Sequence, residues 1–188
     1  MIDLTPACQR TADLLTHITD EQLDGATPCD KLSLRDLVGH IGGLTLAFTA
    51  AARKDFGPLT DTPPEPGAPL DDDWRAAYPR RLAELAQAWQ EPTAWEGMSR
   101  AGGIDFPGEV GGMIALTEVV VHGWDVAVAT GQDYDVDPAT LAAVLPHVTA
   151  IAAEGPTEGL FGPAVPVSQD VSDLDRAIAL TGRQPSRD

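Results

Sequence analysis

The sequence has little cysteine and little positive charge, and each shortage excludes a class of protein. Only Cys8 and Cys29 occur among 188 residues, which excludes a disulfide framework and a CxxC motif. The 12 lysine and arginine residues stand against 29 aspartate and glutamate residues, and the formal net charge is −17. Nucleic-acid backbones and anionic lipids bind clustered cations, so we expect neither nucleic acid nor a membrane as a partner.

The beginning of the chain also lacks a targeting pattern. It reads MIDLTPACQR, without the basic stretch and apolar run of a secretory signal peptide. A chain with two cysteines and no such pattern fits a reducing compartment. We therefore expect a cytoplasmic protein that forms a single domain overall and is a monomer or a homodimer.

What the sequence has in abundance is helical periodicity. Apolar side chains recur about every 3.6 residues in four long segments. These helices are expected to begin at Thr5-Pro6, after Ser33, after 71–73 and at about Glu109, and the first should end near Asp24-Gly25. Prolines and glycines predict a surface loop over 57–69 and an irregular loop over 92–108 with a short strand or hairpin.

Shorter helices are expected after the fourth long one, from Pro138 to about Glu154 and from about Ser172 to Thr181. The sequence therefore predicts an all-α fold. Residues 1–131 would form a four-helix bundle with a ligand or metal site in its core, and residues 132–188 a helical extension packed on the bundle.

Three ionisable side chains interrupt the almost wholly apolar segment 110–130. Glu118, His122 and Asp125 have the spacing i, i+4, i+7, which places them on one face of a helix. A buried carboxylate is destabilising by several kcal/mol unless it is paired or bound to a metal. The same groups, with the glycines at the start of the segment, argue against a membrane span.

Glu118 and His122 are suited to a metal site with open positions, as catalytic zinc and non-haem iron require. His40, in the string LRDLVGHIGG, is the best third ligand, because the glycines around it allow a close approach. His17 and His147 are weaker candidates. His17 lies late in the first helix, where a solvated or half-buried histidine is expected, and His147 has no acidic or histidine partner at helical spacing. A hydrogen-bonded network without metal is the alternative, and the spacing does not distinguish the two.

The strings LSLRDLVGHIGG, TEVVVHGWDVAVATG and LDRAIALTGRQP together resemble the mycothiol-dependent maleylpyruvate isomerase N-terminal-like proteins, within the broader DinB/YfiT-like superfamily. The resemblance implies a DinB-like four-helix bundle with a divalent metal held by His40, Glu118 and His122. Zinc is the first expectation, and nickel and iron are alternatives. Asp125 would orient a ligand imidazole or bind a water beside these ligands.

The resemblance also implies mycothiol as a cofactor. Only about sixty residues follow the fourth helix, whereas the isomerases proper carry a further C-terminal domain, so isomerisation of maleylpyruvate itself is not expected. The first hypothesis is a transferase or isomerase in which metal-bound thiolate attacks an electrophilic small molecule. The alternatives are a metal-dependent hydrolase with Asp125 as base, and a non-enzymatic ligand-binding or regulatory bundle. The sequence assigns no catalytic residue.

Overall fold

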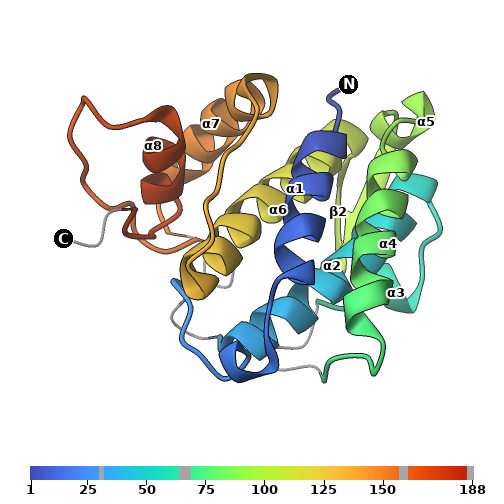
Figure 1. Ribbon diagram of the computed structural model, residues 1–188. Helices are drawn as coiled ribbons and strands as arrows, with labels where there is room; N and C mark the ends of the chain where they lie inside the picture. The colour runs from blue at the N-terminus through green and yellow to red at the C-terminus, as the bar shows by residue number, and fades with distance from the viewer. Residues whose placement is uncertain (30–31, 64–68, 157–160, 186–188) are drawn as a thin grey trace. The chain divides into compact units, whose positions relative to one another are not determined.

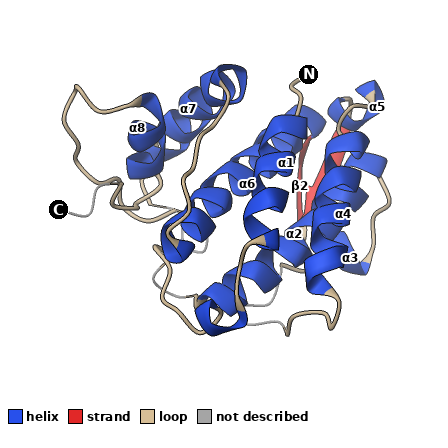
Figure 2. Ribbon diagram, viewed as in Figure 1, coloured by secondary structure: helices blue, strands red, loops and turns tan. Residues whose placement is uncertain are grey.

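The computed structural model describes residues 1–29, 32–63, 69–156 and 161–185 (Figure 1). The chain divides into two compact units, Met1–Asp135 and Val136–Asp188, which are called the first and second unit below. Figure 2 shows that helices make up almost all of the regular structure. The expected all-α class is therefore confirmed.

The described part of the first unit contains four long helices, as predicted. They are α1 (Thr5–Thr16), α2 (Leu34–Arg53), α4 (Trp74–Ala88) and α6 (Gly108–Thr130). Helices α1 and α2 each pack against both α4 and α6, so they stand at opposite corners of the bundle. Fully buried leucines fill the centre: Leu14, Leu15, Leu34, Leu37, Leu82, Leu85 and Leu116.

The start of α2 follows from its first residues. The Ser33 hydroxyl accepts a hydrogen bond from the Asp36 backbone N–H at 3.2 Å, and the Asp36 carboxylate accepts one from the Ser33 N–H at 3.2 Å. This capping box satisfies two donors that the helix end would otherwise leave unpaired. Because the cap fixes where α2 begins, it also fixes the position of His40 along the helix.

Helix α6 is the core helix of the first unit. By length and composition alone it could cross a membrane, but 78% of its most apolar 18-residue stretch is buried inside the protein, as is usual for a core helix. At Gly112 a Cβ atom would lie 2.6 Å from the Trp95 ring, so glycine permits close packing there. The helix ends at Thr130, and the next residue, Gly131, has a φ of 70°, which favours glycine.

Two features of the first helix differ from the prediction. Helix α1 ends at Thr16 rather than near Asp24-Gly25, and a short 3-10 helix, η1 (Asp20–Gln22), follows it. The backbone of Thr19 is extended, and its N–H donates to the Gln22 side chain at 2.9 Å. Ile18 is buried although it lies beyond the helix, so the apolar pattern continued where the helix did not. The sequence also favours Thr5 as the N-cap, with Pro6 at the first helical position, but the N-cap residue is Leu4.

The loops around the bundle contain short elements. The predicted loop 57–69 holds helix α3 (Pro58–Asp61), and residues 64–68 of that loop lie outside the described residues. Over 92–108 the chain forms α5 (Pro92–Trp95) and the expected hairpin, with β1 (Met98–Ala101) antiparallel to β2 (Ile104–Pro107) and Ser99 paired with Phe106. The turn between them consists of Gly102 and Gly103, with φ of 58° and 76°.

The second unit contains the two further helices that the sequence predicts, α7 (Pro138–Ala153) and α8 (Asp173–Leu180), which pack against each other. The Asp137 carboxylate caps α7 by accepting from the N–H groups of Ala139 and Thr140. The segment before α8 pairs with the end of that helix through backbone bonds from Gly162 and Val165. The predicted packing of this extension on the bundle stays a prediction.

Candidate metal centre

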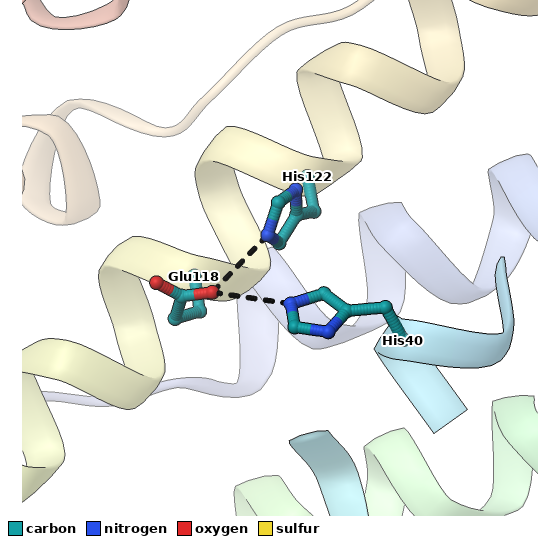
Figure 3. A group of neighbouring side chains, drawn as sticks. All are labelled: His40, Glu118 and His122. Carbon is teal, nitrogen blue, oxygen red and sulfur yellow. Dashed lines mark ion pairs between the residues drawn. The ribbon is translucent and has the colours of Figure 1, made fainter. Parts of the chain in front are cut away.

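The structure brings together the three side chains that the sequence singled out as metal ligands. His40 comes from α2, and Glu118 and His122 come from consecutive turns of α6, which packs against α2 (Figure 3). Each side chain offers one ligand atom, and these atoms all lie within 4.8 Å of one another. In Figure 3 both imidazoles point toward the Glu118 carboxylate from different helices.

The distances within this cluster are short. Glu118 Oε2 lies 3.1 Å from His122 Nε2 and 3.7 Å from His40 Nε2. The two imidazole rings are 4.9 Å apart between centroids and stand at 88° to each other. Two nitrogens and one oxygen therefore face a common point from two helices, and an ion there would have coordination positions left for other ligands.

The cluster is buried, but one side of it is more open. The side chains of Glu118 and His122 are 11% and 9% exposed, whereas the His40 side chain is 21% exposed. Gly42, one of the glycines near His40, does permit a close approach, but on the side of α2 that faces α4. A Cβ atom at Gly42 would lie 2.4 Å from the Tyr78 ring of α4, so this glycine sets the packing of α2 on α4.

Asp125 is completely buried one turn after His122. Its Oδ2 atom lies 3.0 Å from His122 Nδ1. A carboxylate only accepts hydrogen bonds, so Nδ1 carries the proton and donates to Asp125. The other ring nitrogen, Nε2, then faces Glu118 and the cluster. Metal-binding histidines are held in this way by a neighbouring carboxylate.

The same contacts fix the charges in the metal-free cluster. Burial lowers the pKa of His122, but hydrogen bonds to Asp125 and Glu118 outweigh it and raise the pKa to about 9. Burial also acts to raise the pKa of Glu118, yet the two imidazoles hold it well below its usual range. Without a metal, a proton on His122 Nε2 therefore bridges to Glu118.

The donor set fits a divalent ion. With neutral imidazoles, Glu118 and Asp125 give the buried cluster a charge of about −2, which either protons or a divalent cation would neutralise. Two imidazole nitrogens and a carboxylate oxygen are suitable donors for zinc, iron(II) or nickel. The ligand assignment itself stays a prediction.

The other histidines lie elsewhere. His17 is exposed at the end of α1, where its Nδ1 atom is 2.8 Å from the Asp13 carbonyl. His147 belongs to α7 in the second unit, and burial lowers its pKa. Of the histidines in the described residues, only His40 and His122 belong to the cluster.

Two hydroxyl groups beside the turn of α6 that carries Glu118 and His122 were not predicted from the sequence. Thr11 Oγ1 lies 3.3 Å from the Val119 carbonyl, and the Tyr134 hydroxyl lies 2.9 Å from the Val120 carbonyl. Both donors are distant in the chain from the residues they contact. The only local signal was a glycine, Gly123, directly after His122.

Comparison with known proteins yields both relatives and solved structures. Two uncharacterized proteins of Mycobacterium tuberculosis, Rv0738 and MT0763, are each 28% identical to the chain over an alignment of 189 residues. The alignment covers 97% of this chain and 98% of each relative.

Two solved structures also match, the mycothiol-dependent maleylpyruvate isomerase and a histidine-to-alanine variant of it. Their TM-scores are 0.58 and 0.61 at 18% and 19% identity, over 84% of this chain and 73% of theirs. At this identity the structures establish the shared fold. Residues 4–127, which include His40, Glu118 and His122, match the family described as the mycothiol maleylpyruvate isomerase N-terminal domain. The chain belongs to this family.

Proposed function

We propose that this protein binds a divalent metal through His40, Glu118 and His122 and uses it to activate a small thiol, mycothiol, in a transfer or isomerisation reaction. The observation that carries the proposal is the convergence of three donor atoms from α2 and α6 within 4.8 Å. The family, whose description names mycothiol, supports the choice of thiol. The proposed substrate class is an electrophilic small molecule.

Each residue of the centre has a proposed role. His40, Glu118 and His122 hold the ion, and Asp125 keeps the Nδ1 proton of His122 in place so that Nε2 presents its lone pair. A divalent ion at such a site supplies Lewis acidity, which lowers the pKa of a bound thiol. The more open side, at His40, is the proposed direction of approach for the thiol.

The thiol must come from outside the protein. Cys8 is 1% exposed, and burial raises its pKa to about 12, so this side chain stays a protonated thiol at neutral pH. Cys29 is partly exposed and is not a member of the cluster. These properties favour an external thiol, and they fit the proposed reducing cytoplasm.

The hydrolase alternative finds less support. It requires Asp125 to act as a base toward a bound water, but this carboxylate is completely buried and already accepts the Nδ1 proton of His122. A general base must be within reach of the proton that it removes from the nucleophile. Asp125 is better suited to orienting His122 than to activating water.

Metal content is the direct test of the centre. Protein produced with added zinc, nickel or iron should contain close to one equivalent of metal by elemental analysis, and His122→Ala should contain little. His17→Ala is the matched control, because it removes an exposed histidine outside the cluster. Less than about 0.2 equivalents in the wild type would refute the metal assignment.

Thiol binding is tested on cobalt-substituted protein. Addition of mycothiol should produce an absorption band from charge transfer between sulfur and cobalt, since a thiol that coordinates a metal is deprotonated. A protein that binds cobalt but gives no such band would refute the thiol-dependent function. It would leave the non-enzymatic metal-binding bundle as the interpretation.

A further inference from the structure

The turn of α6 that carries the proposed ligands is held from behind by two hydroxyl groups. Thr11 on α1 donates to the Val119 carbonyl at 3.3 Å, and Tyr134, after the end of α6, donates to the Val120 carbonyl at 2.9 Å. In a regular helix these two carbonyls already accept from the N–H groups four residues later. Each hydroxyl therefore adds a second bond to a carbonyl between Glu118 and His122.

Gly123 is the residue that lets both hydroxyls reach the helix. A Cβ atom at this position would lie 2.7 Å from Thr11 Oγ1 and 2.8 Å from the Tyr134 hydroxyl. Real Cβ atoms essentially never approach so closely. Any larger residue would displace at least one hydroxyl. Gly123 follows His122 directly and lies about 140° around the helix from Glu118, so the contacts are made away from the ligand face.

Tyr134 is itself fixed in place. Arg10 of α1 lies over its ring, with the guanidinium carbon 5.9 Å from the ring centroid. The same arginine pairs with Asp135 at 3.2 Å and donates to the Asp133 carbonyl. Burial raises the pKa of Tyr134, so its hydroxyl stays protonated and can donate a hydrogen bond at neutral pH.

We infer that Thr11 and Tyr134 are positioning residues, which fix the α6 turn so that Glu118 and His122 face His40 at metal-binding distance. The inference rests on the proposed metal site. Helix α6 meets α2 on its ligand face and the two hydroxyls on another face, so its rotation and its distance from α2 are both restricted. A preorganised ligand turn binds an ion more tightly than one that must be ordered on binding.

The test uses near-isosteric variants of the full chain, Thr11→Val, Tyr134→Phe and the double variant, loaded with cobalt. Ser99→Ala is the matched control, because Ser99 Oγ also donates to a helix carbonyl, that of Ala51, at 2.8 Å in a buried setting remote from His40. Cobalt affinity is measured by chelator competition at a temperature where every variant is folded. The visible absorption spectrum reports the geometry of the bound cobalt.

The double variant should bind cobalt about tenfold more weakly, because the loss of groups that hold metal ligands in place commonly reduces metal affinity by at least this factor. Its cobalt spectrum should change, and metal-free protein should show faster amide hydrogen exchange at Gly123 and Trp124. Ser99→Ala should lose stability without a change in spectrum. Gly123→Ala, which keeps both hydroxyls in the sequence but excludes them from the helix, should reproduce the spectral change.

Three outcomes would overturn the inference in different ways. A wild-type protein that binds cobalt, with a double variant equal to it in affinity and spectrum, overturns the positioning role and leaves the metal site intact. A wild-type protein that binds no cobalt overturns the proposed function and the positioning role with it. An equal loss of cobalt affinity in the double variant and in Ser99→Ala overturns the positioning role, because only general stability would then be affected.

Discussion

Asp125→Asn should reveal how the buried carboxylate controls the proposed metal site. The substitution keeps the size of the side chain but removes the charge that lies 3.0 Å from His122 Nδ1. Groups that orient a ligand imidazole typically contribute about 10- to 100-fold in metal affinity, or about 1.4 to 2.7 kcal/mol. A hydrogen bond to a charged group contributes about 1.5 to 3 kcal/mol, which is a consistent magnitude.

The pH at which affinity is measured decides whether this loss is visible. The pKa of His122 is raised to about 9 in the metal-free protein, so at pH 7 a metal must displace a proton, which lowers the apparent affinity by about 100-fold. At pH 9 competition with the proton lowers the apparent metal affinity only about twofold. Asp125→Asn lowers the pKa of His122 and relieves the competition, which offsets much of its loss at pH 7.

We therefore expect a 10- to 100-fold loss at pH 9 and a much smaller difference at pH 7. Chelator competition at both pH values measures the affinities, and calorimetry in two buffers counts the protons released. The wild type should release about one proton per metal at pH 7, and the variant fewer. Asp13→Asn, an exposed carboxylate on α1, is the control. An equal loss at both pH values would refute the proposed action through the His122 proton.

Three further outcomes follow from the structure. The pKa of His122 is raised from its ordinary value of 6.5 to about 9 in the folded, metal-free protein. Protonated His122 therefore stabilises this form fully at pH values below 6.5, and the contribution disappears as the pH rises through 9. Removing the metal with a chelator should thus lower the melting temperature more at pH 9 than at pH 6, and an equal shift would contradict this. Cys29 should react with a thiol reagent in the native protein, whereas Cys8 should react only after unfolding because it is buried. Rapid labelling of both thiols in the native protein would disprove this prediction. Gly112→Ala should lower the free energy of unfolding by about 1 to 3 kcal/mol through overpacking against a tryptophan ring. Gly57→Ala is the control, because nothing lies within 4 Å of the added Cβ, and it should leave the free energy of unfolding almost unchanged. Equal chemical denaturation curves for Gly112→Ala and Gly57→Ala would argue against tight packing at Gly112.

The proximity of His40, Glu118 and His122 was predictable from local patterns. The i, i+4, i+7 spacing on an apolar helix required partners for Glu118, His122 and Asp125, and the capping box at Ser33 fixed the register of His40. Both signals lie within a few residues of the groups they describe. The contact between the two helices was expected because apolar faces of a bundle pack together.

Other features depend on contacts between distant parts of the chain and were not predictable. The Tyr134 hydroxyl reaches a helix carbonyl 14 residues earlier, and Thr11 bonds across 108 residues. Such pairs leave no periodic trace in a single sequence. The end of α1 was misplaced for a related reason, because Ile18 is buried by tertiary packing rather than by continuation of the helix.

The position of α6 in the chain has a consequence for biosynthesis. The most apolar of the four long helices is also the last to be translated, so α1, α2 and α4 have already left the ribosome when α6 emerges. A circular permutant that begins at Gly108 would reverse this order. At about 5 to 20 residues per second, α6 would then wait roughly 5 to 20 s for its partner helices, exposed to other nascent chains. The natural order hides this membrane-like segment as soon as it is made.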